Sequence, residues 1–132
     1  MKKILILLLL MVVSTNVMAE WTRVSESADG DITYYVDTGT IKRKGNKVKM
    51  WDLFDYKTVQ KSSDGKEYLS SLSRNEYDCE EETKRMLDFY WYSGNMKNGG
   101  VVISYPNVKD EGTSILPESI GETLFKIACG KK

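Results

Sequence analysis

Cys79 and Cys129 are the two cysteines of this 132-residue chain, and the sequence contains no histidine. Without an imidazole, neither a Ser-His-Asp triad nor a Cys-His pair can be assembled. Two thiols also fall short of the four ligands that a structural zinc site needs. In an exported chain, two thiols most often form a single disulfide. These residues therefore predict a Cys79–Cys129 disulfide and no metal site.

Carboxylates are the remaining candidates for catalysis. Asp52 and Asp55 could act as an acid–base pair, but with 19 acidic residues such proximity is expected by chance. Gly99-Gly100 lacks the following helix that a phosphate-binding loop requires. We therefore predict no catalytic residue, no cofactor and no enzyme activity. An unrecognised hydrolase, for example one with a Ser–Lys dyad, is the alternative interpretation.

Residues 1–19 have the three parts of a cleavable secretory signal peptide. Lys2 and Lys3 precede an apolar run over residues 4–13, and Val17-Met18-Ala19 suits cleavage after Ala19. The run has about half of the roughly 20 apolar residues that a membrane span needs. We therefore expect Sec-dependent export to the periplasm or the cell surface. The mature chain, residues 20–132, is predicted to be one domain with no transmembrane segment.

The charge balance argues against nucleic acid as the partner. The chain has 19 basic and 19 acidic side chains, and signal cleavage would remove two lysines and leave a slight acidic excess. Binding to phosphates needs a basic excess on at least one face. The clusters Lys42-Arg43-Lys44 and Glu80-Glu81-Glu82 lie beside turn residues and are interpreted as solvated loop ends. We expect no nucleic-acid partner.

Short runs rich in β-branched and aromatic residues, typical of strands, fill most of the mature sequence. Turn residues such as Asp29-Gly30, Gly45-Asn46 and Ser63-Asp64-Gly65 separate them. About six strands are predicted, at residues 21–25, 32–37, 47–57, 67–77, 84–92 and 101–105.

The period then changes, and apolar residues recur at helical spacing over residues 117–129. Pro117 suits a first helical position, Ser119-x-x-Glu122 a capping box and Gly130 a helix stop. The fold class is therefore α+β: an antiparallel sheet of about six strands with one carboxy-terminal helix tied to it by the disulfide.

One short helix can cover only one face of such a sheet. Two apolar sets alternate along the strands at residues 47–57 and 84–92. The bulkier set, predicted to lie under the helix, is Trp51, Leu53, Leu87, Phe89 and Trp91. The other is predicted to bind a protein partner or a second copy in a homodimer, with coverage by loops as the alternative: Met50, Phe54, Tyr56, Tyr90 and Tyr92.

Short motifs are spread over nearly the whole mature sequence. They are Tyr35-Val36-Asp37 with Thr40-Ile41, Val48-x-x-Trp51-x-Leu53-x-Asp55-Tyr56, Ser71, Tyr77-Asp78-Cys79, Arg85, Pro117-x-Ser119, Glu122, Leu124 and Cys129. In this order, with both cysteines in place, the chain resembles the surface-adhesin protein E-like family of Gram-negative bacteria. The resemblance implies an antiparallel sheet tied to a carboxy-terminal helix. It also implies an adhesin-like role, since the family's namesake binds host matrix and plasma proteins.

The sequence thus predicts an exported, non-enzymatic binding protein. The resemblance favours a bacterial surface adhesin for host matrix or plasma proteins. The alternative is a periplasmic structural or accessory protein of the cell envelope without a host ligand.

Overall fold

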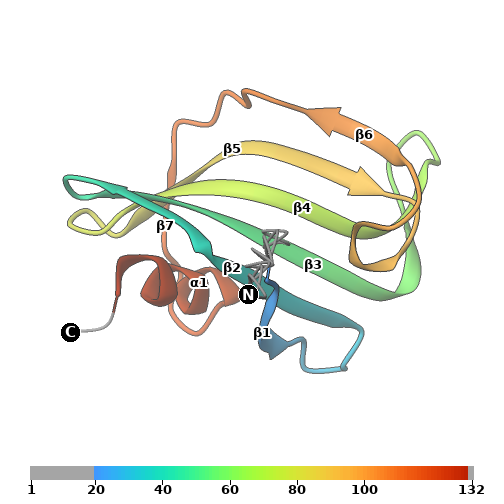
Figure 1. The fold of residues 1–132 in the computed structure, drawn as a ribbon, viewed down its shortest axis with the longest axis horizontal. Coiled ribbons are helices and arrows are strands. Elements are labelled where there is room, and N and C mark those ends of the chain that lie inside the picture. Colours follow the sequence, from blue (N-terminus) through green and yellow to red (C-terminus); the bar gives the residue numbers. More distant parts are fainter. Residues whose placement is uncertain (1–19, 131–132) are drawn as a thin grey trace, which may run out of the picture.

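The computed structural model describes residues 20–130, so the predicted signal at residues 1–19 lies outside the described residues. Seven strands form one antiparallel sheet (Figure 1). Their bounds are β1 Thr22–Glu26, β2 Ile32–Lys44, β3 Lys47–Lys61, β4 Glu67–Asp78, β5 Thr83–Tyr92, β6 Val101–Tyr105 and β7 Thr113–Ser114. A short 3₁₀ turn, η1 (Asn95–Lys97), precedes β6, and the helix α1 spans Ile120–Cys129. The predicted α+β class is confirmed.

The strands follow one another in space as they do in sequence, in the order β1-β2-β3-β4-β5-β6, with β7 beside β5. Tight turns join consecutive strands at positions where glycine adopts a left-handed backbone conformation. Gly45 (φ +61°) joins β2 to β3, and Gly65 (φ +83°) joins β3 to β4. All six predicted strands are present. The pair of residues that forms β7 was not predicted, because a two-residue strand has no recognisable alternation.

The helix α1 begins at Ile120, three residues after the predicted start at Pro117. Ser119 is the N-cap: its side-chain oxygen accepts a 3.1 Å hydrogen bond from the backbone N–H of Glu122. The residue before it, Glu118, has a left-handed backbone (φ +59°), so the helix cannot extend back through it. Gly130 ends the helix at the predicted position with positive φ, although its ψ of 145° lies outside the left-handed helical region that was predicted.

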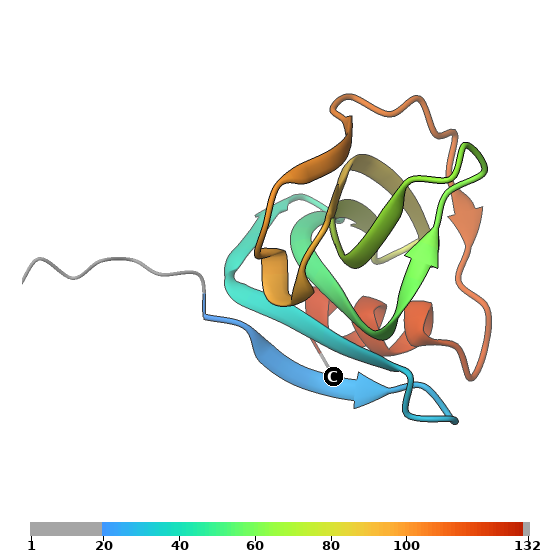
Figure 2. The same ribbon diagram turned by 90° about the vertical axis from the view of Figure 1, so that its right-hand side faces the viewer.

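The predicted disulfide between Cys79 and Cys129 is present and joins the end of β4 to the end of α1. A ten-residue helix has little stability of its own in water. The covalent link holds α1 against the sheet at the end where β2 turns into β3 (Figure 1). Viewed at right angles, the sheet is strongly curved (Figure 2).

The core lies between α1 and this end of the sheet. Leu124 and Ala128 of α1 are buried there against apolar side chains of β2, β3 and β4. The fully buried partners are Val36, Val48, Met50 and Tyr77. We call the sheet side that faces α1 the helix side, and the opposite one the far side.

Candidate binding surface

Cross-strand register assigns each strand residue to one side, because directly opposed residues point the same way. Met50 lies opposite Asn75, and Asn75 lies opposite Met86, so these three are on the helix side. Leu53, Leu72 and Tyr90 form another such row, on the far side.

The predicted partner face is wrong in its composition. Met50 is fully buried in the core beneath α1, and Phe54 packs against the same core. Tyr56 is also on the helix side, where its ring lies 5.6 Å from that of Tyr68. Tyr90 and Tyr92 lie on the far side, so the five residues do not share a face.

A break in the alternation of β5 explains the error. Arg74 pairs with Asp88 and Asn75 with Met86, which leaves Leu87 as an extra residue between them. Such a bulge reverses the alternation beyond it. Met86 therefore lies on the helix side with Phe89 and Trp91 rather than opposite to them.

The bulkier set is also not what lies under α1. Trp51 and Leu53 are on the far side, because they alternate along β3 with Met50, which lies in the core beneath α1. Phe89 and Trp91 are on the helix side, away from the core beneath α1. The predicted grouping of Trp51, Leu53, Leu87, Phe89 and Trp91 under the helix is therefore wrong.

Trp51 is the centre of a compact cluster on the far side. Its ring stacks with that of Tyr90 at a centroid distance of 6.3 Å, and the Arg74 guanidinium carbon lies 5.5 Å from the Trp51 centroid. Arg74 Nε donates a 2.6 Å hydrogen bond to the buried carboxylate of Asp88. We call Trp51, Arg74 and Tyr90 the Trp51 cluster; its residues are half-buried and keep part of their surface in solvent.

The loop that contains η1 covers one end of the far side. Asp55 accepts a 2.7 Å hydrogen bond from the Met96 backbone N–H, and the buried Ser70 hydroxyl accepts one of 3.0 Å from Lys97 N–H. Lys97 Nζ lies 5.8 Å from the ring centroid of Trp21, next to β1. This loop therefore closes the far side at one end, next to β1.

The helix side carries a second aromatic group, away from the core beneath α1. The Tyr68 and Trp91 rings stack at 4.1 Å, Phe89 follows at 5.7 Å, and Tyr105 stacks on Phe89 at 4.8 Å. We call Tyr68, Trp91, Phe89 and Tyr105 the aromatic row. It crosses β4, β5 and β6.

The carboxylates considered for catalysis do not meet. Asp52 is 1% exposed on the helix side, whereas Asp55, an odd number of residues later on the same strand, points to the far side. Burial raises the pKa of Asp52 to about 7, although a hydrogen bond from Asn75 and the charge of Lys84 oppose the rise. Among residues 20–130 the structure shows no group of three or more acidic, cysteine or histidine side chains placed to hold a metal ion.

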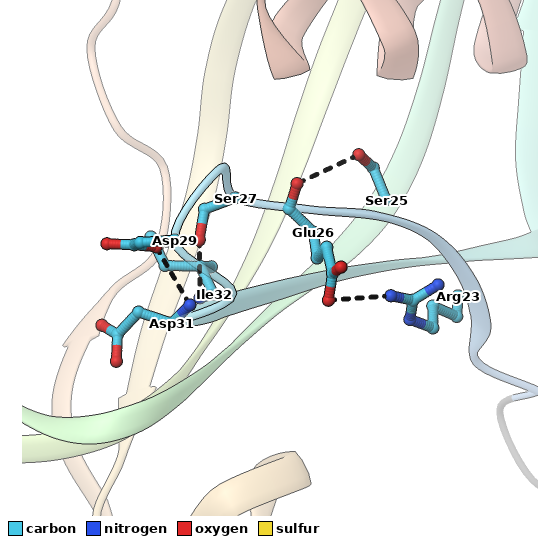
Figure 3. A network of polar contacts seen from close by, with 7 residues as sticks. All are labelled: Arg23, Ser25, Glu26, Ser27, Asp29, Asp31 and Ile32. Carbon is cyan, nitrogen blue, oxygen red and sulfur yellow. Dashed lines mark hydrogen bonds and ion pairs between the residues drawn. The ribbon is translucent and has the colours of Figure 1, made fainter.

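Exposed polar side chains also gather at the turn between β1 and β2 (Figure 3). Ser27 Oγ donates to Asp29 Oδ1 over 2.7 Å and accepts from the Ile32 N–H over 2.9 Å, while Arg23 pairs with Glu26 at 3.0 Å. These hydrogen bonds are made within the turn itself. The bonds that Asp29 accepts from the Asp31 N–H and from Ser27 lower the pKa of its carboxyl group. The arrangement stabilises a turn and does not define a ligand site.

The Trp51 cluster could not be found by sequence reasoning, because its members come from three strands. Trp51 stands out in the sequence as an aromatic strand residue, but Arg74 carries no local signal that sets it apart. The pairing of β3 with β4 places Arg74 opposite Trp51. This pairing is irregular between Asp55 and Gln60, where the register shifts. The hairpin turn at Ser63-Asp64-Gly65 alone therefore does not fix which residues oppose one another.

Within the described part of the chain, no helix has the length and hydrophobicity needed to cross a membrane. No curated protein sequence matches the chain. Solved structures of Haemophilus influenzae protein E have a similar fold. Crystal form II is 14% identical with a TM-score of 0.65, over 87% of this chain and 91% of that one. A second structure is 15% identical with a TM-score of 0.63, over 87% of each chain.

Protein E from non-typeable Haemophilus influenzae is also similar, with 15% identity and a TM-score of 0.62 over 87% of this chain and 78% of that chain. At these identities the likeness concerns the fold. The family model for surface-adhesin protein E matches residues 21–130, from the residue before β1 to the residue after α1. This chain therefore belongs to the surface-adhesin protein E family.

Proposed function

We propose that this chain is an exported, non-enzymatic adhesin that binds a host matrix or plasma protein through the Trp51 cluster. Membership of the surface-adhesin protein E family supports the adhesin role. The signal-like residues 1–19 support export, with cleavage after Ala19 and a mature domain at residues 20–132.

The observation that carries the proposal is the fixed position of Arg74 over the Trp51 ring. Asp88 holds the Arg74 guanidinium through the 2.6 Å bond, and Tyr90 holds the indole from beside it. Trp, Tyr and Arg are the residues that most often dominate binding energy at protein interfaces. Side chains that are already ordered lose little conformational entropy when a partner binds. The cluster is thus suited to anchor a protein.

Binding can be tested with the mature protein and a panel of purified matrix and plasma proteins immobilised for surface plasmon resonance. The double variant Trp51→Ala/Tyr90→Ala should weaken binding to the captured partner at least tenfold, because it removes two anchors of the interface. Leu116→Ala, which removes a 68% exposed apolar side chain outside the Trp51 cluster, is the matched control and should bind as wild type. Circular dichroism should show both variants folded.

Three outcomes would count against the proposal. Equal binding by the Trp51 cluster variant and the wild type would place the interface elsewhere. A sedimentation profile in which the same variant loses a dimer would identify a second copy as the partner. Absence of binding to every protein of the panel, with the protein inaccessible to protease on intact cells, would favour the structural or accessory role in the periplasm.

Export has its own test. Intact-mass analysis of the protein recovered from the cell envelope should give a chain that begins at Glu20. A mass that includes residues 4–13 would contradict cleavage and leave the binding proposal unaffected.

A further inference from the structure

The aromatic row borders a groove of about 510 Å³ that runs along the edge strand β6. Phe89 and Trp91 of β5 and Tyr105 of β6 form its aromatic wall, and Ser62, Asp64 and Lys66 of the β3–β4 hairpin form a polar rim. The β3–β4 hairpin lies at the end of the sheet opposite to α1 (Figure 1). The size falls within the range of small-ligand sites, about 300–1,000 Å³.

The aromatic wall is accessible and ordered. Tyr105 is 54% exposed and lines the groove, while one face of its ring is supported by stacking on Phe89 at 4.8 Å. Trp91 is held in turn by its 4.1 Å stacking with Tyr68. An aromatic ring has a negative face, which attracts the weakly positive C–H groups of a ligand laid against it.

The polar rim offers hydrogen-bonding groups without a net charge. Ser62 Oγ donates a hydrogen bond to Asp64 Oδ1 and accepts one of 3.0 Å from the Lys66 backbone N–H, so this hydroxyl serves the turn. Lys66 Nζ lies 3.9 Å from Asp64 Oδ2. The carboxylate and the ammonium group balance each other, so the groove favours neither an anion nor a cation. A ligand that both donates and accepts hydrogen bonds can use the carboxylate and the ammonium group together.

From this combination we propose that the groove binds a neutral pyranose unit of a glycan. A pyranose presents a face of C–H groups to an aromatic ring and a rim of hydroxyls to polar side chains, which is the pattern of the groove. The site is separate from the Trp51 cluster, since none of Trp51, Arg74 and Tyr90 lines the groove. Neutral sugar units occur both in bacterial envelope glycans and in host glycans, so the same chemistry has two sources.

The test uses the ¹⁵N-labelled mature protein titrated with chitobiose, lactose and cellobiose. At least one disaccharide should shift the indole N–H signal of Trp91 in a saturable manner and leave that of Trp51 unchanged, with the signals assigned from Trp91→Phe and Trp51→Phe. A sulfated heparin disaccharide, which matches in size but carries negative charge, should not bind. Saturable binding of the heparin disaccharide but of none of the neutral sugars would overturn the proposal.

Two variants test the site itself by calorimetry with the disaccharide that binds. Tyr105→Ala removes the exposed aromatic ring, and Ser63→Arg places a large side chain at the exposed hairpin beside the groove. Each should weaken binding at least tenfold, while Leu116→Ala, at a 68% exposed position that does not line the groove, should not change it. The two variants do not share a packing role, so a folding defect in one leaves the other informative. Binding within twofold of wild type in a folded variant, or no saturable shift with any neutral sugar, would contradict the site.

The two sources are separated by comparing soluble glycan strands from bacterial cell wall with desialylated mucin oligosaccharides. A Trp91 shift with either one supports the groove and identifies its source. The Trp51 cluster variant should retain sugar binding, so failure of the adhesin proposal and failure of this one give different results.

Discussion

Asn75 Nδ2 donates a 2.9 Å hydrogen bond to Asp52 Oδ2 inside the core, where Asp52 is 1% exposed and Asn75 5% exposed. A carboxylate in such a place is poorly solvated, and one amide hydrogen bond does not compensate for the lost water. Burial therefore raises the pKa of Asp52 to about 7.

This raised pKa predicts that the protein loses stability as the pH rises from 5 to 8. The folded protein keeps the Asp52 proton up to about pH 7, whereas the unfolded chain releases it near pH 4. The unfolded state thus binds fewer protons across this window, and the free energy of unfolding falls by about 2–3 kcal/mol. Urea unfolding of the mature protein at pH 5 and pH 8 measures the difference.

Asp52→Asn is the matched variant, since it keeps the shape and the acceptor for Asn75 but cannot ionise. Its free energy of unfolding should be nearly equal at pH 5 and pH 8. Hydrogen-bonded Asp29 and Asp110 have lowered pKa values, so their contributions fall below this pH window. A wild type as stable at pH 8 as at pH 5, or a variant with the same loss, would refute the prediction.

The Cys79–Cys129 disulfide closes a loop with a sequence separation of 50 residues. On the chain-entropy model, a loop of this length stabilises the fold by about 4 kcal/mol. The double variant Cys79→Ala/Cys129→Ala should therefore unfold at lower urea, and its helical signal at 222 nm should weaken first because α1 is short. Added reductant should destabilise the wild type and leave the variant unchanged. Equal stability with and without reductant would show that the link does not hold α1.

Leu124 is 2% exposed, at the centre of the contact between α1 and the sheet. Leu124→Ala should lower the free energy of unfolding by about 2–5 kcal/mol through lost burial and a residual cavity. Lys126→Ala, on the exposed face of the same helix, is the control and should change it by less than about 0.5 kcal/mol. Chemical denaturation of both variants decides the matter, and similar small effects would mean that α1 is peripheral to the core.

Most of the fold could be predicted because its signals are local. Turn residues at Gly45 and Gly65 separate the strands, and the change to helical spacing before Gly130 marks α1. The disulfide followed from cell compartment and residue type. None of these signals depends on how distant strands are paired.

The candidate site depends on pairing, and the sequence does not reveal it. The extra residue Leu87 reverses the alternation of β5, and nothing in its type distinguishes it from a regular strand residue. The η1 loop closes one end of the far side through Met96 and Lys97, which have the left-handed backbone that is uncommon outside glycine. Long-range contacts with Asp55 and Ser70 hold them there.

The last prediction concerns the ion pair that positions Arg74. Asp88 is 5% exposed and accepts bonds from Arg74 Nε at 2.6 Å and from the Asn107 N–H at 3.0 Å. Asp88→Ala should lower the free energy of unfolding by about 1–3 kcal/mol, because it leaves two donors without their acceptor. It should also release the guanidinium from the Trp51 ring and weaken binding of the protein partner, although Asp88 is too buried to touch that partner.

Arg85→Ala is the matched control. Arg85 makes a similar pair with Glu76 at 2.9 Å, but it is not part of the Trp51 cluster. It should leave partner binding unchanged. A double-mutant cycle between Asp88→Ala and Arg74→Ala separates positioning from stability, since binding losses through one ion pair should not add. In wild type the Arg74 Nε–H NMR signal should exchange slowly with water, and in Asp88→Ala it should broaden or disappear. If that signal persists, or if the binding losses of the two variants add, Asp88 does not act through Arg74.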